Sequence, residues 1–348
     1  MDFDNTSYTE LSELGEFGLI KHLTQFIELN QESTLKGVGD DAAVIDYKDE
    51  QTVISTDMLV EGVHFDLSYV PLRHLGYKSV VVNLSDIFAM NAVPKQILVS
   101  IAISSKFSLE ALEELYAGML LACKKYKVDL VGGDTTSSRS GLVLSITALG
   151  SSKAENIVYR NTAKEGDLLC VSGDLGGAYM GLQILEREKA VFKDNPNLQP
   201  DLEGKDYILE RQLKPEARQD VIQQLKELNI RPTAMIDISD GLSSEILHLC
   251  QQSEVGVELY EDKLPIDPLT FETAREFNLD PTVCVLSGGE DYELLFTIPI
   301  SDYDKIKTSM DLTVIGHITN ASKGCLMVAK AGTVHELTAQ GWNALLKK

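Results

Sequence analysis

The sequence predicts a mixed α/β protein of two domains. Its 348 residues correspond to about two domains at the usual ~150 residues each. Hydrophobic residues make up 44% and charged residues 24%, a globular balance that supplies enough apolar side chains for a sizeable core. Helical and strand-like patterns occur on both sides of a small, polar stretch at residues 150–156. We therefore expect an N-terminal domain of residues 1–149 and a C-terminal domain of residues 150–348.

The first half begins with a helical pattern over residues 16–29, where apolar side chains recur at helical spacing. A longer helix is expected to begin after Ser108, whose hydroxyl can cap it, and to continue through Tyr126. Residues 73–90 fit a helix or a strand equally well by period alone. The expected strands of this half are residues 42–46, 52–56, 96–104, 130–131 and 142–149.

The second half restarts with a strand, a glycine-rich turn and a helix over residues 167–188 (DLLCVSGDLGGAYMGLQILERE). Residues 186–207 form the most polar segment, which we expect to be a surface excursion. Further helices are expected at residues 217–228 and 241–252. The remaining strands are expected at residues 235–239, 292–298 and 314–318, the second of them (YELLFTI) with alternating burial.

The charge balance excludes one large class of function. The chain carries 53 acidic and 31 basic residues, which gives a net charge of −22. A nucleic-acid partner is therefore not expected, because the phosphate backbone is bound by Lys and Arg. If the substrate is anionic, cations must mediate its contact with so acidic a protein.

The cysteines and the apolar runs indicate a cytoplasmic protein. The five cysteines are scattered, without a CxxC pair, which is typical of free thiols in a reducing compartment. No uninterrupted apolar run approaches the ~18 residues of a membrane helix. The first residues, MDFDNTSYTELSELGE, lack the basic start and apolar centre of a signal peptide. We expect no membrane partner.

Five short stretches share one design, in which an apolar run ends at an aspartate beside a small or hydroxyl residue. They are GVGDDAAVI (Asp40, Asp41), TVISTDM (Ser55, Thr56, Asp57), VVVNLSDI (Asp86), DLVGGDTT (Asp134) and MIDISDG (Asp237, Asp240). Mg²⁺ takes oxygen ligands and often bridges carboxylates to substrate phosphates. Any single stretch has a simpler explanation as a turn or a cap, for instance of the helix expected near Gly241. The recurrence favours a shared metal centre.

Other phosphate and nucleotide motifs are absent or poorly placed. The sequence has no GxxxxGK[ST] loop, no GxSxG elbow and no protein-kinase HRD or DFG set. GVGDDA follows a polar stretch and precedes no evident helix, unlike a dinucleotide-binding turn. SGDLGGAYMG does connect a strand to a helix, so its backbone N–H groups can hold a phosphate. Turn packing explains this stretch equally well.

Seven motifs in order resemble those of thiamine-monophosphate kinases, in the superfamily that includes aminoimidazole ribonucleotide synthetase. They are GVGDDAAV, ISTDMLVEGVHF, KSVVVNLSDIFAMNAVP, VGGDTT, RNTAKEGD, IDISDGL and SGGEDYELLF, within a match over about residues 16–342. The resemblance implies a two-domain fold whose N-terminal domain pairs in a homodimer and whose residues 73–90 are helical. It also implies transfer of the γ-phosphoryl group of ATP to thiamine monophosphate, the last step of thiamine diphosphate biosynthesis.

The same resemblance implies roles for individual residues. The implied magnesium ligands are Asp41, Ser55, Thr56, Asp57, Asp86, Asp134, Asp237 and Asp240. Asp57, Asp86 and Asp237 are the residues on which catalysis is expected to depend most directly. The implied ATP contacts are Tyr116, Gly133, Asp134, Arg160 and Ser239. The implied contacts to thiamine monophosphate are His64, Glu290 and Trp342.

Several of the residue roles that the resemblance implies have a purely structural alternative. His64 can be a packed or turn histidine, Glu290 can support the SGG turn, and Arg160 can belong to a surface ion pair. Trp342 can anchor the C-terminal segment, whose sequence GWNALLKK departs from the aromatic-Asp-His-Phe-like end common in the family. An aromatic face there would also suit a cationic thiazolium ring.

The implied reaction needs no general base. A phosphate monoester has a second pKa of about 6, so the acceptor is largely dianionic at neutral pH. Several Mg²⁺ ions would screen it from ATP, and transfer is expected to be direct and in line. The alternatives are a selenophosphate synthetase, a hydrogenase-maturation dehydratase and a non-catalytic nucleotide-binding module. The first is expected to carry an early reactive cysteine, whereas Cys123 is the first here; the second ends in a cysteine, whereas this chain ends in Leu-Lys-Lys.

Overall fold

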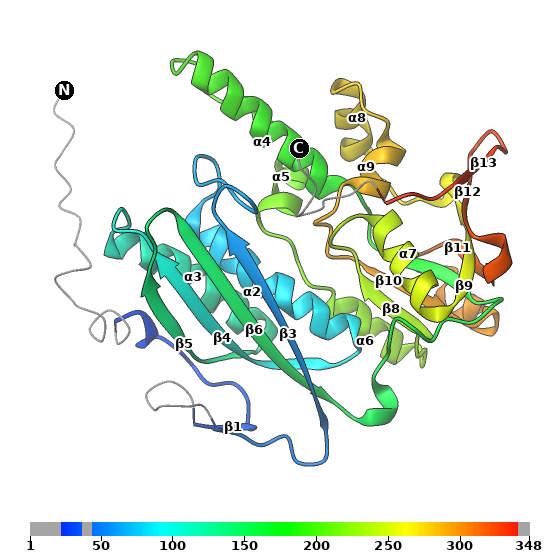
Figure 1. Ribbon diagram of the computed structural model, residues 1–348, viewed down its shortest axis with the longest axis horizontal. Helices are drawn as coiled ribbons and strands as arrows, with labels where there is room; N and C mark the ends of the chain where they lie inside the picture. The colour runs from blue at the N-terminus through cyan, green and yellow to red at the C-terminus, as the bar shows by residue number, and fades with distance from the viewer. Residues whose placement is uncertain (1–21, 37–43, 340–348) are drawn as a thin grey trace. The chain divides into compact units, whose positions relative to one another are not determined.

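The computed structural model describes residues 22–36 and 44–339, which form two compact units (Figure 1). The first unit takes the chain up to Ile87 and Val93–Lys153, and the second takes Phe88–Ala92 and the chain from Ala154 onward. Each unit combines a β-sheet with α-helices, so the fold is of the mixed α/β, two-domain class that the sequence predicts.

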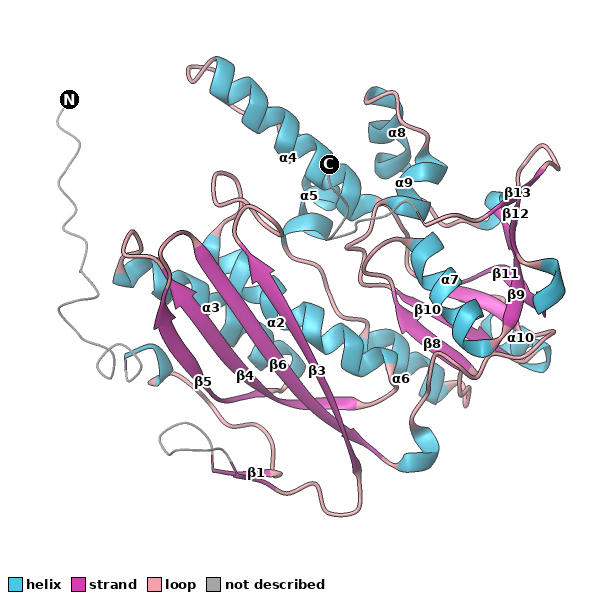
Figure 2. Ribbon diagram, in the orientation of Figure 1, coloured by secondary structure: helices cyan, strands magenta, loops and turns pink. Residues whose placement is uncertain are grey.

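The first unit is a four-stranded sheet with two long helices on one face (Figure 2). Across the sheet, the strands are β3 (Gln51–Val60), β6 (Leu142–Ser152), β4 (Val93–Ile103) and β5 (Asp129–Ser137). Only the pair β4–β5 is parallel. The helices are α2 (Leu72–Ala89) and α3 (Leu109–Tyr126), and a separate small ladder joins β1 (Thr34–Lys36) to β2 (Val44–Ile45).

The segment whose period was ambiguous is the helix α2, as the family resemblance implies. It packs against α3, and its side chains are buried almost all round, so it has no polar stripe to reveal a helical period. Glycines let the two helices meet: a Cβ at Gly76 would lie 1.9 Å from the Leu115 carbonyl oxygen. Ser108 caps α3 as expected, by accepting a hydrogen bond from the Ala111 N–H at 3.3 Å.

The other face of this sheet is open in the described part of the chain. Successive side chains of a strand point to opposite faces, and Leu144 and Ile146 of β6 are buried toward the helices. On the open face Ile54 and Met58 of β3 are 63% and 57% exposed.

The second unit is built on a seven-stranded sheet, in which only β12 and β9 pair in parallel. In order across the sheet, the strands are β13 (Val334–Glu336), β12 (Cys325–Val328), β9 (Val255–Tyr260), β11 (Leu312–Asn320), β7 (Leu168–Ser172), β10 (Leu294–Ile298) and β8 (Ala234–Asp237). The α-helices are α4 (Gly177–Asp194), α5 (Asp206–Leu213), α6 (Gln219–Glu227), α7 (Leu242–Ser253), α8 (Pro268–Glu276), α9 (Pro281–Ser287) and α10 (Tyr303–Ile306). Single 3₁₀ turns occur at Ala154–Asn156, Glu261–Lys263, Ile300–Asp302 and Ala321–Lys323.

The expectation of alternating burial along residues 292–298 is wrong. Every residue of β10 is buried, because the strand lies between β7 and β8 and both of its faces are covered. Leu295 packs in a cluster with residues of α7, whereas Leu294 and Phe296 pack in a second cluster with residues of α6. A central strand of this kind shows a continuous apolar run instead of a period of two.

Two further expectations concern the membrane and the cysteines. Within residues 22–36 and 44–339, no helix is both long and apolar enough to cross a membrane. All five cysteines are free thiols, four of them buried and Cys325 partly buried. The described structure therefore contains no disulfide.

Candidate functional site

Asp57 and Asp86 form the centre of the candidate site in the first unit. Asp57 and Ser55 alternate with the exposed Ile54 and Met58, so their side chains point from β3 toward the helices. There the Ser55 hydroxyl donates to the Asp86 carboxylate at 2.5 Å. Burial, and then the charge of Asp86, raise the pKa of Asp57 to about 6.

A carboxylate pair of this kind favours a bound cation. The charge of Asp86 repels that of Asp57, and a divalent cation removes the repulsion by binding both. Ser55 adds a neutral oxygen, so the donor set consists of the oxygen ligands that Mg²⁺ prefers. Among the described residues no group of three or more His, Cys, Asp or Glu side chains comes together as a metal site. Asp41 lies outside the described residues.

Thr56 and Asp134 point away from this pair. The Thr56 hydroxyl donates to the Ile146 carbonyl oxygen at 3.0 Å and lies 3.1 Å from the Thr147 hydroxyl, on the open face of the sheet. Asp134 is exposed on β5, in register with Ser100 of β4. Alternation along β4 puts both on the open face as well, at the far edge of the sheet from β3. Within one chain the structure therefore does not bring these side chains to Asp57.

Two of the expected ATP contacts have clear structural roles in the first unit. A Cβ at Gly133 would lie 1.8 Å from the Val99 carbonyl oxygen, so only glycine fits where β5 meets β4. Tyr116 is a core residue of α3, 7% exposed, and burial raises its pKa to about 12. Their roles as ATP contacts stay predictions.

His64 follows β3 in a tight turn. Its ring Nδ1 atom accepts a hydrogen bond from the Val60 N–H at 3.1 Å. The backbone N–H of His64 donates to the Val60 carbonyl oxygen at 2.9 Å. A ring whose Nδ1 accepts a hydrogen bond is neutral and carries its proton on Nε2. The Nε2 atom of His64 is therefore suited to donate a hydrogen bond to a phosphate oxygen and not to act as a base.

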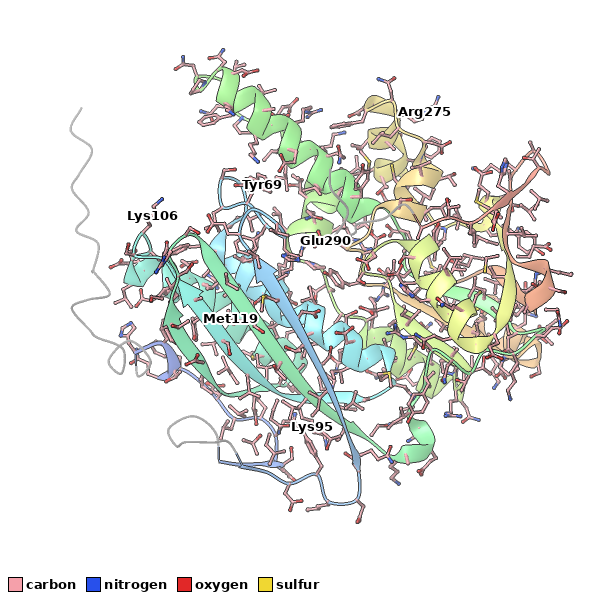
Figure 3. The ribbon with its side chains drawn as sticks, in the orientation of Figure 1. Tyr69, Lys95, Lys106, Met119, Arg275 and Glu290 are labelled. Atoms are coloured by element: carbon pink, nitrogen blue, oxygen red, sulfur yellow. The ribbon has the colours of Figure 1, made fainter. Side chains whose placement is uncertain are left out.

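In the second unit, two sequence motifs form one interlocked pair of loops. Asp237 ends β8, and the next residues run beside the loop of residues 288–293, which enters β10. The N–H of Glu290 donates to the Ser239 carbonyl oxygen at 2.7 Å. Gly289 has a φ of 71°, and a Cβ on it would lie 2.6 Å from the same oxygen. This contact between backbones puts Glu290, labelled in Figure 3, next to Ser239.

The pKa of Asp240 in this second site is shifted by its surroundings. Burial, and also the charge of Glu290, raise the pKa of Asp240 above its usual value, while His248 lowers it. Asp237 is 6% exposed at the end of β8. The helix α7 begins at Leu242 with Gly241 as its N-cap residue, so neither aspartate occupies the capping position. Helix capping therefore does not explain Asp237 and Asp240.

A buried glutamate that the sequence reasoning missed supports this turn. Glu245 is 2% exposed, and its carboxylate accepts from the Asp240 N–H at 3.0 Å and lies 3.5 Å from the Ser239 hydroxyl. Burial raises the pKa of Glu245 to about 7. Its position five residues after Asp240, on the first turn of α7, was the available signal in the sequence.

The glycine-rich turn at the start of α4 is occupied by the protein's own carboxylate. Asp291 is 1% exposed and accepts hydrogen bonds from the N–H groups of Gly176 at 2.8 Å and Ala178 at 3.5 Å. An anion at a helix N-terminus satisfies these donors and interacts favourably with the helix dipole. The packing interpretation of SGDLGG is therefore favoured over a phosphate site.

Arg160 and Trp342 are the remaining two expected contacts. Arg160 is exposed in the turn after the first unit, where its carbonyl oxygen accepts from the Ser253 hydroxyl at 3.0 Å. Its guanidinium forms no ion pair with any residue that the structure describes, so the surface ion-pair alternative gains no support. Trp342 lies outside the described residues.

Comparison with known proteins defines the class to which this fold and these acids belong. Residues 39–152 match the N-terminal domain of AIR synthase related proteins, and residues 164–329 match their C-terminal domain. Hydrogenase maturation protein HypE has the same fold at 18% identity, with a TM-score of 0.71.

Closer relatives narrow the family. The thiamine-monophosphate kinase of Aquifex aeolicus (strain VF5) is 34% identical over 308 residues, covering 88% of this chain and 92% of the relative. That of Buchnera aphidicola subsp. Schizaphis graminum is 36% identical, covering 91% and 94%. A structure of AaThiL complexed with AMPPCP and TMP superposes with a TM-score of 0.73 at 31% identity, covering 97% of this chain and 99% of that one. The crystal structure of the Stenotrophomonas maltophilia K279a enzyme gives a TM-score of 0.76 at 30% identity, covering 93% and 98%. The chain belongs to the thiamine-monophosphate kinase family.

Proposed function

We propose that this protein transfers the γ-phosphoryl group of ATP to thiamine monophosphate and so makes thiamine diphosphate, the last step of its biosynthesis. The names of the relatives support this, as does the AaThiL complex with TMP and AMPPCP, which is an analogue of ATP. Within this chain, the observation that carries the proposal is the Asp57–Asp86 pair. Two adjacent carboxylates would repel a phosphate unless cations lay between them.

The proposed magnesium ligands come from both units. Asp57, Asp86 and Ser55 provide a set of oxygen donors in the first unit, and Asp237 and Asp240 provide carboxylates in the second. Asp41, Thr56 and Asp134 complete the proposed set, Thr56 through its backbone, since its side chain points to the open face. Bound Mg²⁺ would supply neutralisation of charge between ATP and the anionic acceptor.

The chain's own residues would position two reactants that need little further activation. The acceptor phosphate is largely dianionic at neutral pH, with a second pKa of about 6, so no side chain has to remove a proton from it. The Nε2–H of His64 can donate to a phosphate oxygen. Catalysis would then consist of alignment and charge neutralisation, in a direct in-line transfer without a phosphoenzyme.

The contacts to the two substrates are part of the same proposal. Arg160, Ser239, Gly133 and Tyr116 are assigned to ATP on the motifs they belong to. Glu290 and Trp342, with His64, are assigned to thiamine monophosphate. Trp342→Ala should mainly raise the KM for thiamine monophosphate, and an unchanged KM would remove this residue from the site.

We further propose that the protein is a cytoplasmic homodimer formed through its N-terminal domain. The open sheet face, with Ile54 and Met58 exposed, supports pairing with a second copy. Asp134 lies on that same face, so in a dimer it could approach the partner. In this proposal residues 1–149 bind ATP and magnesium and form the dimer contact.

One incubation tests the proposed activity. The protein is mixed with ATP, MgCl₂ and thiamine monophosphate, and the products are separated by chromatography. We expect thiamine diphosphate and ADP in equal amounts, with no product when magnesium is chelated. A folded protein that binds ATP and yields no thiamine diphosphate would instead support a non-catalytic nucleotide-binding module.

A further inference from the structure

The loop of residues 288–293 holds Glu290 in a backbone conformation that most side chains avoid. The φ angle is 59° at Glu290 and 51° at Tyr292. Residues other than glycine rarely adopt this region because their Cβ atom crowds the backbone, so the surrounding structure must hold it in place. The contacts of this loop therefore determine where the Glu290 carboxylate lies.

Glu293 anchors the end of the loop in a buried cluster of charges. It is fully buried, and its carboxylate accepts from the Ser172 hydroxyl at 2.5 Å, from Arg211 at 2.8 Å and from Arg218 at 2.5 Å. Gly173 leaves no spare room, because a Cβ on it would lie 2.5 Å from the Glu293 carboxylate. The two arginines reach Glu293 from α5 and from the residue before α6.

The charges of this cluster balance one another. Arg211 also lies 3.6 Å from Asp291, so two buried carboxylates face two guanidinium groups whose side chains are only 14% and 12% exposed. A buried ion pair of this kind adds little net stability compared with apolar packing of the same volume. Such a cluster is better explained by the conformation that it specifies than by the free energy of unfolding that it adds.

The residue that follows Arg211 contacts Glu290 directly. Gln212 is 6% exposed, and its amide Nε2 donates to the Glu290 carboxylate at 2.8 Å. A carboxylate only accepts hydrogen bonds, so the NH₂ group of the amide must be the side that faces it. Consecutive residues of α5 thus fix the loop at two points, Arg211 through Glu293 and Gln212 through Glu290 itself.

We propose that Gln212 is a positioning residue for the phosphate acceptor, with Arg211 holding the loop on which it acts. Gln212 occupies one carboxylate oxygen of Glu290 and so fixes the orientation of that group. An oriented carboxylate is suited to accept an N–H from an aminopyrimidine ring. This role rests on the proposed function, which assigns Glu290 to thiamine monophosphate.

Steady-state kinetics of a double-mutant cycle test this role. The variants are Gln212→Leu, Glu290→Gln and both together, with Gln223→Leu as a matched control, because Gln223 is an exposed glutamine on α6. Loss of one hydrogen bond to a charged group should raise the KM for thiamine monophosphate about tenfold in Gln212→Leu. The KM for ATP and kcat should change much less, and Gln223→Leu should match the unaltered protein.

The cycle separates positioning from a general structural effect. If Gln212 acts through Glu290, adding Gln212→Leu to Glu290→Gln changes the KM little further. Gln212→Glu keeps the side-chain size and serves if Gln212→Leu does not fold; its carboxylate should repel Glu290 and raise the KM at least as much. An unchanged KM in Gln212→Leu or Gln212→Glu, or an equal effect in both backgrounds, would overturn the inference. Absence of thiamine diphosphate with the unaltered protein would defeat the proposed function itself, and the role of Gln212 with it.

Discussion

The backbone N–H of Asp57 donates to the Oδ1 atom of Asn83 at 2.9 Å, and this bond ties β3 to α2 beside the carboxylate pair. Asn83 is fully buried, and its Nδ2 donates to the Ser79 carbonyl oxygen at 3.0 Å. Asn83 and Asp86 are three residues apart on α2, so they lie on the same face of the helix. One helix face therefore supplies both the charge that raises the pKa of Asp57 and the bond that fixes its backbone.

Asp57→Asn should reduce activity strongly while the fold persists. The change removes a charge that a cation and the transferred phosphoryl group would need, which we expect to cost roughly 100- to 1,000-fold in kcat. It also relieves repulsion with Asp86, so the free energy of unfolding should be unchanged or higher. Asp49→Asn, an exposed acid in the turn before β3, is the control for kinetics and urea unfolding. Near-normal turnover of Asp57→Asn would contradict the proposed metal site.

Asn83→Ala should lower both stability and activity. Without the amide, the Asp57 N–H loses its acceptor between β3 and α2, which should cost about 1–3 kcal/mol of unfolding free energy. Urea unfolding measures this cost, and Asn197→Ala on an exposed segment after α4 is the matched control. The kinetics should show a higher magnesium requirement, because Asp57 is no longer held against Asp86. A variant as stable and as active as the control would argue against this role.

Magnesium alone should stabilise the protein. A ligand that binds only the folded state adds about 2.7 kcal/mol when it is present at 100 times its Kd. Thermal unfolding should therefore move to higher Tm as MgCl₂ is added and return on chelation with EDTA. Asp57→Asn should lose most of this response, whereas Asp49→Asn should keep it. An equal rise in Tm for both variants would mean that the ions bind elsewhere.

Much of the fold was predictable from local patterns, and the failures have physical causes. The helix α3 shows its period because only one face is buried, and Ser108 marks its start. The helix α2 shows no helical period because almost all of its residues are buried. The prediction of alternating burial for the strand β10 was wrong for a related reason, because a central strand is buried on both faces. A period is visible only where one side of an element meets water.

The sequence predicted the acidic residues of the candidate site but not the residues that hold them in place. The resemblance singled out Asp57, Asp86, Asp237 and Asp240. Asp86 lies on the helix α2 and Asp237 ends the strand β8, whereas Asp57, expected directly after a strand, lies within β3. No local sequence pattern predicted that Gln212 contacts Glu290, because the two are 78 residues apart and meet only through the packing of α5. Which face of the sheet carries Asp134 likewise depended on the register of β5 with β4.

A charge on the open sheet face should prevent pairing of two copies. Ile54→Glu puts a carboxylate among the apolar side chains of β3, where burial in a dimer would be costly. Sedimentation velocity should give the mass of a dimer for the unaltered protein and that of a monomer for the variant. Val191→Glu is the control, because Val191 is an exposed apolar residue of α4 in the other unit. A monomeric unaltered protein, or a dimeric Ile54→Glu, would contradict the proposed pairing.

Asp291 should make stability fall as the pH rises through weakly acidic values. Burial raises the pKa of this carboxyl to about 6 in the folded protein, against the opposing effects of Arg211 and of the Gly176 N–H. In the unfolded chain its pKa is about 3.9, so between these values the folded state binds more protons than the unfolded state. The contribution is fully present below about pH 4 and is lost as the pH passes about 6, a change of roughly 3 kcal/mol.

Asp291→Asn keeps an acceptor for the α4 N–H groups and does not titrate. Urea unfolding at several pH values should therefore show the unaltered protein losing stability relative to this variant between about pH 4 and pH 7. Curves that stay parallel over this range would show that Asp291 is charged throughout, held so by Arg211.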